Sequence, residues 1–159
     1  MQDRAVGQLA TGSLRVEVVG SSPTLATNSK YIIMFKDFKT HLPKGFIGHK
    51  KSTEYGESLY IFKEDGSGLV RLEDDDSVKG DFWIMELSVS VGCREEGLGT
   101  ILMNIAENIA LYNDATKLRL WVEKDKWMRS WYERLGFKDD GENDELGKIT
   151  MSKYLVPKA

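Results

Sequence analysis

Apolar and polar residues alternate with a period of two in several segments, which is typical of half-buried β-strands. The segments predicted as strands are residues 14–18, 58–62, 69–72, 82–91, 118–122 and 148–155. The alternation in 82–91 predicts one shared face for Trp83, Met85, Leu87, Val89 and Val91. Glycines between 62 and 69 can take the positive φ of a tight reversal, so these two strands are predicted to form a hairpin.

Apolar residues recur every three or four positions after residue 97, and this spacing predicts an amphipathic helix. Its apolar stripe consists of Leu98, Ile101, Leu102, Ile105, Ile109 and Tyr112. A second helix is predicted over 127–135, where Gly136 offers a left-handed stop before Phe137.

Residues 24–57 have the least regular pattern. We predict a helix over 30–42, with Tyr31, Met34, Phe35 and Phe38 on one side, although Ile32-Ile33 suits a strand equally well. Early strands follow one another and later strands alternate with helices. This order predicts an α/β (mixed α+β) fold in which helices cover both faces of a mixed sheet.

Composition favours one globular domain over residues 1–159, since 41% of residues are hydrophobic and 30% are charged. The net charge of −3 gives no support to a nucleic-acid partner. The longest apolar run, Tyr31–Phe35, is far too short for a membrane-spanning helix, so we expect no membrane partner. Residues 1–8 build no apolar stretch of the kind that secretory signals need, and we expect a cytoplasmic protein.

Cysteine and histidine are too scarce to predict a disulfide or a metal site. Cys93 is the single cysteine, which excludes an intramolecular disulfide and a thiolate zinc site. His41 and His49 stand eight positions apart and form no metal-binding motif. We therefore expect no metal.

A glycine-containing turn, with Gly92, Gly97 and Gly99, joins the strand over 82–91 to the helix that begins at Leu98. The first amides of a helix lack partners within the helix, and the helix dipole adds positive potential there. Glycines keep this backbone accessible, so the turn is predicted to bind phosphate oxygens. Arg94 adds a planar cation with several donors.

Two common phosphate-binding motifs do not fit this turn. Gly92 and Gly97 have the glycine spacing of GxxxxGK[ST], but Leu98 and Gly99 replace the lysine and the hydroxyl residue. The GxGxxG motif fails because Leu102 occupies the third glycine position. These mismatches exclude a P-loop NTPase and a Rossmann-type dinucleotide-binding site.

The pattern that fits is Arg94, Gly97 and Gly99 opening a helix directly after Leu87-Ser88-Val89. It resembles the signature Gln/Arg-x-x-Gly-x-Gly/Ala of the GNAT superfamily of acyl-CoA-dependent N-acyltransferases. Residues 132–137, Tyr-Glu-Arg-Leu-Gly-Phe, are similar to the family's Tyr-x-x-x-Gly-Phe block, and residues 151–155 resemble its closing strand. The resemblance covers residues 82–155.

This resemblance implies a GNAT-like fold with a mostly antiparallel sheet of about six to seven strands, splayed at a central parallel pair. It also implies acetyl-CoA as co-substrate. The residues that would bind it are Leu87, Ser88, Val89, Arg94, Glu95, Glu96, Gly97, Leu98, Gly99, Thr100 and Asp125. Glu95, Glu96 and Asp125 depart from the usual family pattern, which favours weaker binding of the pyrophosphate.

The same resemblance implies direct transfer of an acetyl group to a primary amine. Tyr132 is the candidate for hydrogen bonding to the departing thiolate, against the alternative of a tyrosine packed on the core. Glu86 is the candidate base, opposite Leu87 and Val89, against the alternative of a solvated strand residue. Cys93 has no role in direct transfer.

Two acidic segments, 73–76 and 139–145, flank strands that usually rim the acceptor site in this family. They favour a cationic acceptor, such as a polyamine, an amino sugar or a basic peptide terminus, although such runs are often only solvated turns. A homodimer is also compatible with the sequence. The alternative function is a catalytically silent CoA-binding module that acts through a protein partner, and a ligand-free interaction domain ranks third.

Overall fold

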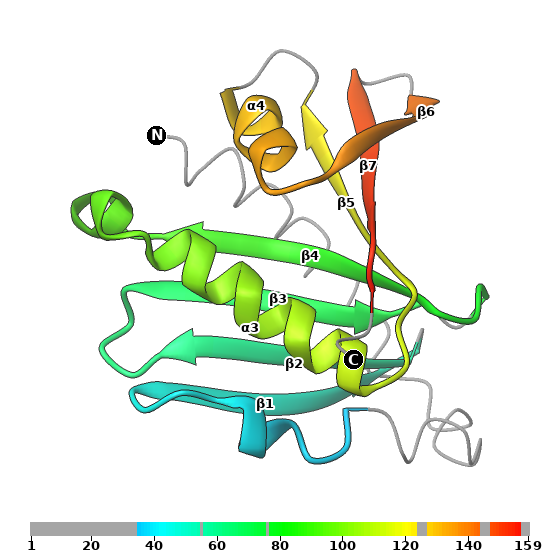
Figure 1. Cartoon of the computed structure of the whole chain (residues 1–159). Coiled ribbons are helices and arrows are strands. Elements are labelled where there is room, and N and C mark those ends of the chain that lie inside the picture. The colour runs from blue at the N-terminus through cyan, green and yellow to red at the C-terminus, as the bar shows by residue number, and fades with distance from the viewer. Residues whose placement is uncertain (1–34, 55, 76, 124–126, 144–146, 157–159) are drawn as a thin grey trace.

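Seven strands of the described residues form one mixed sheet in the order β1-β2-β3-β4-β5-β7-β6 (Figure 1). The computed structural model describes residues 35–54, 56–75, 77–123, 127–143 and 147–156. The strands are β1 (Phe46–Thr53), β2 (Gly56–Lys63), β3 (Gly68–Asp74), β4 (Asp81–Val89), β5 (Lys117–Glu123), β6 (Lys138–Asn143) and β7 (Lys148–Tyr154). The strand predicted over 14–18 lies outside the described residues. The predicted mixed, mostly antiparallel sheet is confirmed.

The central strands β4 and β5 run parallel and separate after a short paired stretch. Residues Asp81–Ile84 pair with Lys117–Leu120, and no pairing joins the two strands beyond that point. Strand β4 continues to Val89 and β5 to Glu123, so the strands diverge (Figure 1). We call the opening between residues 85–89 and 121–123 the fork. It confirms the predicted splay of the parallel pair.

A β-bulge in β4 changes which side chains share a face. Arg71 of β3 pairs with Glu86, whereas the next residue, Leu72, pairs with Ile84, and Met85 is left without a partner. One extra residue shifts the alternation by one position. The core-facing residues are therefore Phe82, Ile84, Leu87 and Val89. The prediction that Trp83 and Met85 share this face was wrong, because a bulge depends on the partner strand.

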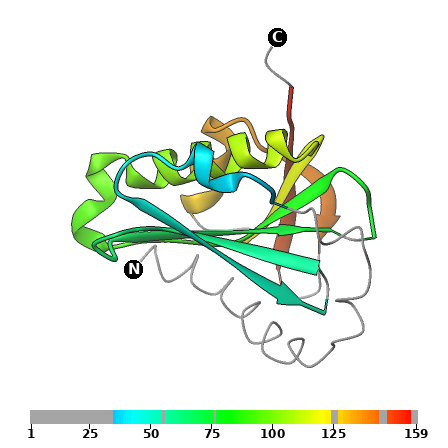
Figure 2. The ribbon, with the colours of Figure 1, turned by 90° about the horizontal axis from the view of Figure 1, so that it is seen from below.

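Helix α3 (Leu98–Tyr112) lies across β2, β3 and β4 (Figures 1 and 2). The predicted bounds are confirmed. Its buried side is formed by Leu98, Leu102, Met103, Ile105, Ala106, Ile109 and Ala110. Ile101 and Tyr112, predicted in the apolar stripe, are instead 42% and 44% exposed, because alanines and Met103 complete the buried side.

Helix α4 (Trp127–Arg134) contacts β5 and contributes Met128 and Tyr132 to the same core. Gly136 has a φ of 102° and ends this segment before the buried Phe137, as predicted. Within the described ranges, no helix is long and apolar enough to cross a bilayer. The helix predicted over 30–42 begins outside those ranges.

The described end of that predicted helix has another structure. Phe35 and Asp37 have positive φ values of 54° and 55°, which an α-helix excludes, and a short 3₁₀ helix η4 (Phe38–His41) follows. Phe35 and Phe38 are nevertheless buried, as the pattern predicted. The prediction of an α-helix up to residue 42 was therefore wrong.

Candidate functional site

Among the described strands, none pairs with the β5 side of β4 over residues 85–89, where the fork opens. The side chains of Leu87 and Val89 are buried in the core, whereas Glu86 and Ser88 lie half-buried on the opposite face. This confirms the predicted alternation of residues 86–89. A ligand in the fork would meet the backbone of Leu87 and Val89 rather than their side chains.

The turn that follows β4 leads into α3 without a side-chain cap. The amide of Ser90 donates to the carbonyl of Ser67 at 2.8 Å, and the 3₁₀ helix η5 (Val91–Glu96) comes next. Gly97 is the N-cap residue of α3, with a φ of 75° and no side-chain hydrogen bond to the helix. A Cβ at Gly92 or Gly97 would meet nothing within 4 Å. The first amides of α3 therefore begin at an open, uncapped turn that suits an anion.

The other predicted cofactor residues divide into three groups. Leu98 is buried and packs against Gly68, so only its backbone is available to a ligand. Thr100 is half-buried on the first turn of α3. The side chains of Arg94, Glu95 and Glu96, and the whole of Asp125, lie outside the described structure.

Gly99 marks the place where β4, α3 and α4 meet. A Cβ at this position would lie 3.3 Å from the indole of Trp131 and 3.7 Å from Cγ2 of Val89. The glycine therefore lets the start of α3 approach α4 closely. This packing, as well as access for a ligand, explains the glycine.

Tyr132 of α4 is 1% exposed, and its ring packs edge-on to Phe137 with centroids 5.9 Å apart. Its hydroxyl is buried and has no hydrogen-bond partner. Burial raises the pKa of Tyr132 well above its ordinary value, so the phenol stays protonated. Buried polar groups almost always have partners, and an unpartnered hydroxyl donor marks a place where an acceptor fits.

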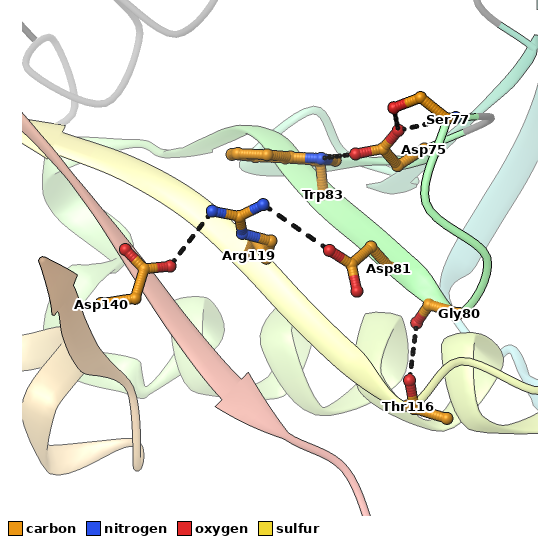
Figure 3. Close-up of polar contacts among 8 residues, drawn as sticks. All are labelled: Asp75, Ser77, Gly80, Asp81, Trp83, Thr116, Arg119 and Asp140. Carbon is orange, nitrogen blue, oxygen red and sulfur yellow. Dashed lines mark hydrogen bonds and ion pairs between the residues drawn. The ribbon is translucent and has the colours of Figure 1, made fainter. Parts of the chain in front are cut away.

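The closed end of the fork is held by Arg119 of β5 (Figure 3). Its guanidinium lies 3.6 Å from a carboxylate oxygen of Asp81, 3.2 Å from one of Asp140, and 4.7 Å from the ring centroid of Trp83. Trp83 in turn stacks on Trp121 with centroids 4.6 Å apart. These contacts tie β4, β5 and β6 together, and sequence reasoning missed them. The available signal was the tryptophan on each of two neighbouring strands.

Several carboxylates of the two acidic segments that the structure describes have partners within the protein. Glu73 accepts a hydrogen bond from Ser58, Asp75 accepts one from Trp83, and Asp139 and Asp140 pair with Arg129 and Arg119. The described part of the second acidic segment, residues 139–143, belongs to the edge strand β6 rather than to a solvated turn. No group of His, Cys, Asp and Glu side chains in the described ranges is arranged to hold a metal ion.

Asp75 couples this region to pH. Burial acts to raise its pKa, but hydrogen bonds from Trp83 and Ser77 outweigh burial and lower the pKa below the usual value. The ionised Asp75 carboxylate therefore stabilises the folded protein fully above its unfolded-state pKa near ~3.9. This contribution is lost as the pH falls through the lower pKa of Asp75 in the folded protein.

We expect Trp83→Phe to lower the free energy of unfolding by about 1 kcal/mol at pH 7, because Asp75 loses the indole donor at 2.9 Å. The variant should then lose less stability than the wild type on acidification below pH ~4. Thermal unfolding at pH 7 and pH 3 measures both effects. Trp127→Phe, at an exposed position, is the control. An equal loss of stability between pH 7 and pH 3 in Trp83→Phe and wild type would contradict the proposed effect of the Trp83–Asp75 hydrogen bond.

Comparisons with known proteins agree with this geometry. Residues 41–155 match a family model described as Acetyltransferase (GNAT) domain. No curated protein sequence is significantly similar to the chain.

Three solved structures illustrate the likeness of fold. A GNAT family acetyltransferase from Elizabethkingia anophelis with acetyl-CoA bound has a TM-score of 0.53 and 14% identity, over 71% of this chain and 100% of that one. An IAA acetyltransferase from Bacillus cereus has a TM-score of 0.53 and 14% identity, over 69% of this chain and 99% of that one. The aminoglycoside 6'-N-acetyltransferase from Enterococcus faecium has a TM-score of 0.53 and 15% identity, over 64% and 77%.

Proposed function

We propose that this chain, which belongs to the GNAT acetyltransferase family, transfers an acetyl group from acetyl-CoA to a primary amine in a ternary complex. One observation carries the proposal: the uncapped start of α3 lies next to the unpaired edge of β4 and to α4, where Tyr132 has a buried hydroxyl without a partner. Family membership supports the acetyl group. The amine acceptor and the residue roles are our inference.

The described residues fit acetyl-CoA. The amides of 97–100 would hold the pyrophosphate, since helix N-termini bind anions through N–H groups and the dipole. The backbone of Leu87 and Val89 would bind the pantetheine arm along the fork. When bound, acetyl-CoA supplies an activated thioester, from which the acceptor nitrogen takes the acetyl group with release of the thiol.

Two side chains would handle protons. The Tyr132 hydroxyl would donate a hydrogen bond to the sulfur as negative charge develops there, a role that suits a phenol kept neutral by burial. Glu86, half-buried on the opposite face of β4, would accept the proton that the amine loses, directly or through water. Since the phenol stays protonated, Tyr132 should cause no fall in kcat between pH 7 and pH ~10.

A two-step experiment tests the proposal. Calorimetry with acetyl-CoA measures binding, and thiol release with a panel of amines measures turnover. We expect saturable binding and release of one thiol per acetylated amine. Binding without turnover for any amine would favour the alternative, a silent CoA-binding module. No binding at all would overturn the proposed activity.

We further propose that the acceptor amine is positively charged when it reaches the protein. The net charge of −3 and the acidic segments 73–76 and 139–145 support this, although their described carboxylates already have partners. Rates with cationic amines should fall as ionic strength rises, because salt screens the attraction. The Debye length falls from about 14 Å to about 4 Å between 0.05 and 0.5 M salt. Steady-state rates that stay equal over this range would contradict a cationic acceptor.

The acceptor is a small molecule or a peptide in this proposal, and no nucleic acid or membrane takes part. We place the protein in the cytoplasm, because the proposed reaction consumes acetyl-CoA. A homodimer is compatible with this activity, and light scattering would measure it.

A further inference from the structure

A buried arginine on the face of the sheet opposite α3 forms no ion pair with any of the described residues. Arg71 of β3 is 0% exposed, between Val70 and Leu72, whose side chains belong to the core under α3. Its Nη1 donates to the Tyr60 hydroxyl at 3.2 Å, and its guanidinium lies 5.6 Å from the centroid of that ring. Its Nε and Nη2 atoms are buried and have no hydrogen-bond partner.

Arg119 on the same face differs from Arg71 in its charge partners, although its Nε also lacks a hydrogen-bond partner. It has Asp81 and Asp140 within 4.0 Å, whereas no ion pair joins Arg71 to a carboxylate of the described residues within that distance. Leaving a buried charge without its partner costs several kcal/mol. A water molecule can accept the free N–H groups but cannot neutralise the charge. An anion that reaches the free edge of Arg71 would supply both the acceptor and the charge.

The two free donors define the shape of that anion. Nε–H and Nη2–H lie on one edge of the planar guanidinium, and their bonds point in parallel. A carboxylate presents two oxygens at the matching separation and can accept both bonds at once. The free edge of Arg71 thus fits a carboxylate better than a single-atom anion.

The position of Arg71 places this edge near the proposed reaction. Arg71 pairs in register with Glu86, which lies just beyond the bulge, where β4 leaves β5. Tyr60, which accepts the hydrogen bond from Arg71, also lines an open groove of about 720 Å³. The groove is lined by His49, Lys51, Tyr60, Phe62, Gly66, Gly68 and Leu69, and no acidic side chain is among them. Its electrostatics suit a negatively charged group.

We propose that Arg71 binds the carboxylate of the acceptor, so that the substrate class is an amino acid or another amine that also bears a carboxylate; the positive charge proposed above is then that of its ammonium group, not of the whole molecule. This inference rests on the proposed acetyl transfer. Arg71 takes the negative end of the zwitterion, and Glu86 faces it across the strand pair from the side where the amine reacts. Tyr60 contacts both the Nη1 side of Arg71 and the groove, so a movement of this side chain would open a route from the groove to the guanidinium.

The first test compares acids with their amides. Common amino acids and ω-amino acids of increasing length are each paired with the primary amide and assayed for thiol release with the wild-type protein. A charged bidentate contact predicts a kcat/KM at least about tenfold higher for the best acid than for its amide. Equal values for every pair, or better rates for the amides, would overturn the proposal.

Variants of Arg71 make the test specific. Arg71→Lys keeps the charge but loses the parallel donors, and Arg71→Met removes both. Each variant should lower the ratio of kcat/KM for the acid to kcat/KM for its amide towards one, mainly through KM. Arg134→Lys, on the exposed side of α4, is the control and should keep the wild-type ratio. If the variants lost kcat/KM equally for acids and amides, Arg71 would be a structural residue and the proposal would be overturned. If neither variant folds, the wild-type comparison decides.

A binding measurement separates this inference from the activity on which it rests. The Arg71 Nε–H resonance is followed while the same acids and amides are added without acetyl-CoA. A saturable shift with acids and none with amides supports the site, even if no amine is acetylated. A resonance that responds to neither, or to both alike, overturns it.

Discussion

Replacing Tyr132 by phenylalanine is expected to lower kcat by roughly ten to a hundredfold, with little change in the affinity for acetyl-CoA. The variant loses the only polar atom of a side chain that is otherwise packed in the core. That atom has no partner in the protein, so its removal breaks no internal hydrogen bond, and we expect the melting temperature to stay equal or to rise. The loss of rate should therefore come from the transition state alone.

Steady-state rates, with chemistry shown to be rate-limiting, and calorimetry with acetyl-CoA measure these two effects. Tyr154→Phe removes a hydroxyl from a side chain that is 73% exposed and serves as the control. An unchanged kcat in Tyr132→Phe would remove the proposed role of this hydroxyl. A large loss of affinity with unchanged kcat would make Tyr132 a binding residue instead.

Replacing Gly99 by valine is expected to weaken acetyl-CoA binding by about tenfold or more and to lower the free energy of unfolding by about 1–3 kcal/mol. The new Cβ would lie 3.3 Å from Trp131 before its two methyl groups are added. Either α4 moves away from α3 or the first turn of α3 shifts, and both movements displace the amides that would hold the pyrophosphate.

Gly92→Val is the control for the folding effect of this variant; it lies in the same open turn, so its acetyl-CoA affinity is recorded only for comparison. A Cβ at Gly92 meets nothing within 4 Å, and its φ is not in the left-handed region, so the same side chain should fit without displacing α3. Calorimetry with acetyl-CoA and thermal unfolding are measured for both variants. Equal affinities for the wild type and Gly99→Val would contradict the proposed position of the pyrophosphate.

Sequence periodicity predicted the elements whose burial is one-sided and local. The stripe of α3, the hairpin of β2 and β3 and the end of α4 at Gly136 all follow from spacing and glycine position. Strand β1 was missed because it is an edge strand with mostly exposed side chains, so it has no apolar alternation. The acidic edge strand β6 was missed for a similar reason: polarity alone predicts a turn.

Features that depend on a distant strand were beyond a pattern along the chain. The bulge at Met85 exists because Arg71 and Leu72 pair across it, and it moved Trp83 to the opposite face. The contact of Arg119 with Trp83 then follows from the register of β4 and β5. The burial of Arg71 left no signal either, since a charged residue in a half-buried strand normally faces solvent.

The central claim is that the first amides of α3 hold the pyrophosphate of acetyl-CoA, and backbone amide resonances recorded during a titration test it most directly. We predict that the amide signals of Gly97, Gly99 and Thr100 shift and saturate together with the heat of binding. Binding that leaves these three signals in place while shifting others, or no binding at millimolar acetyl-CoA, would contradict the account.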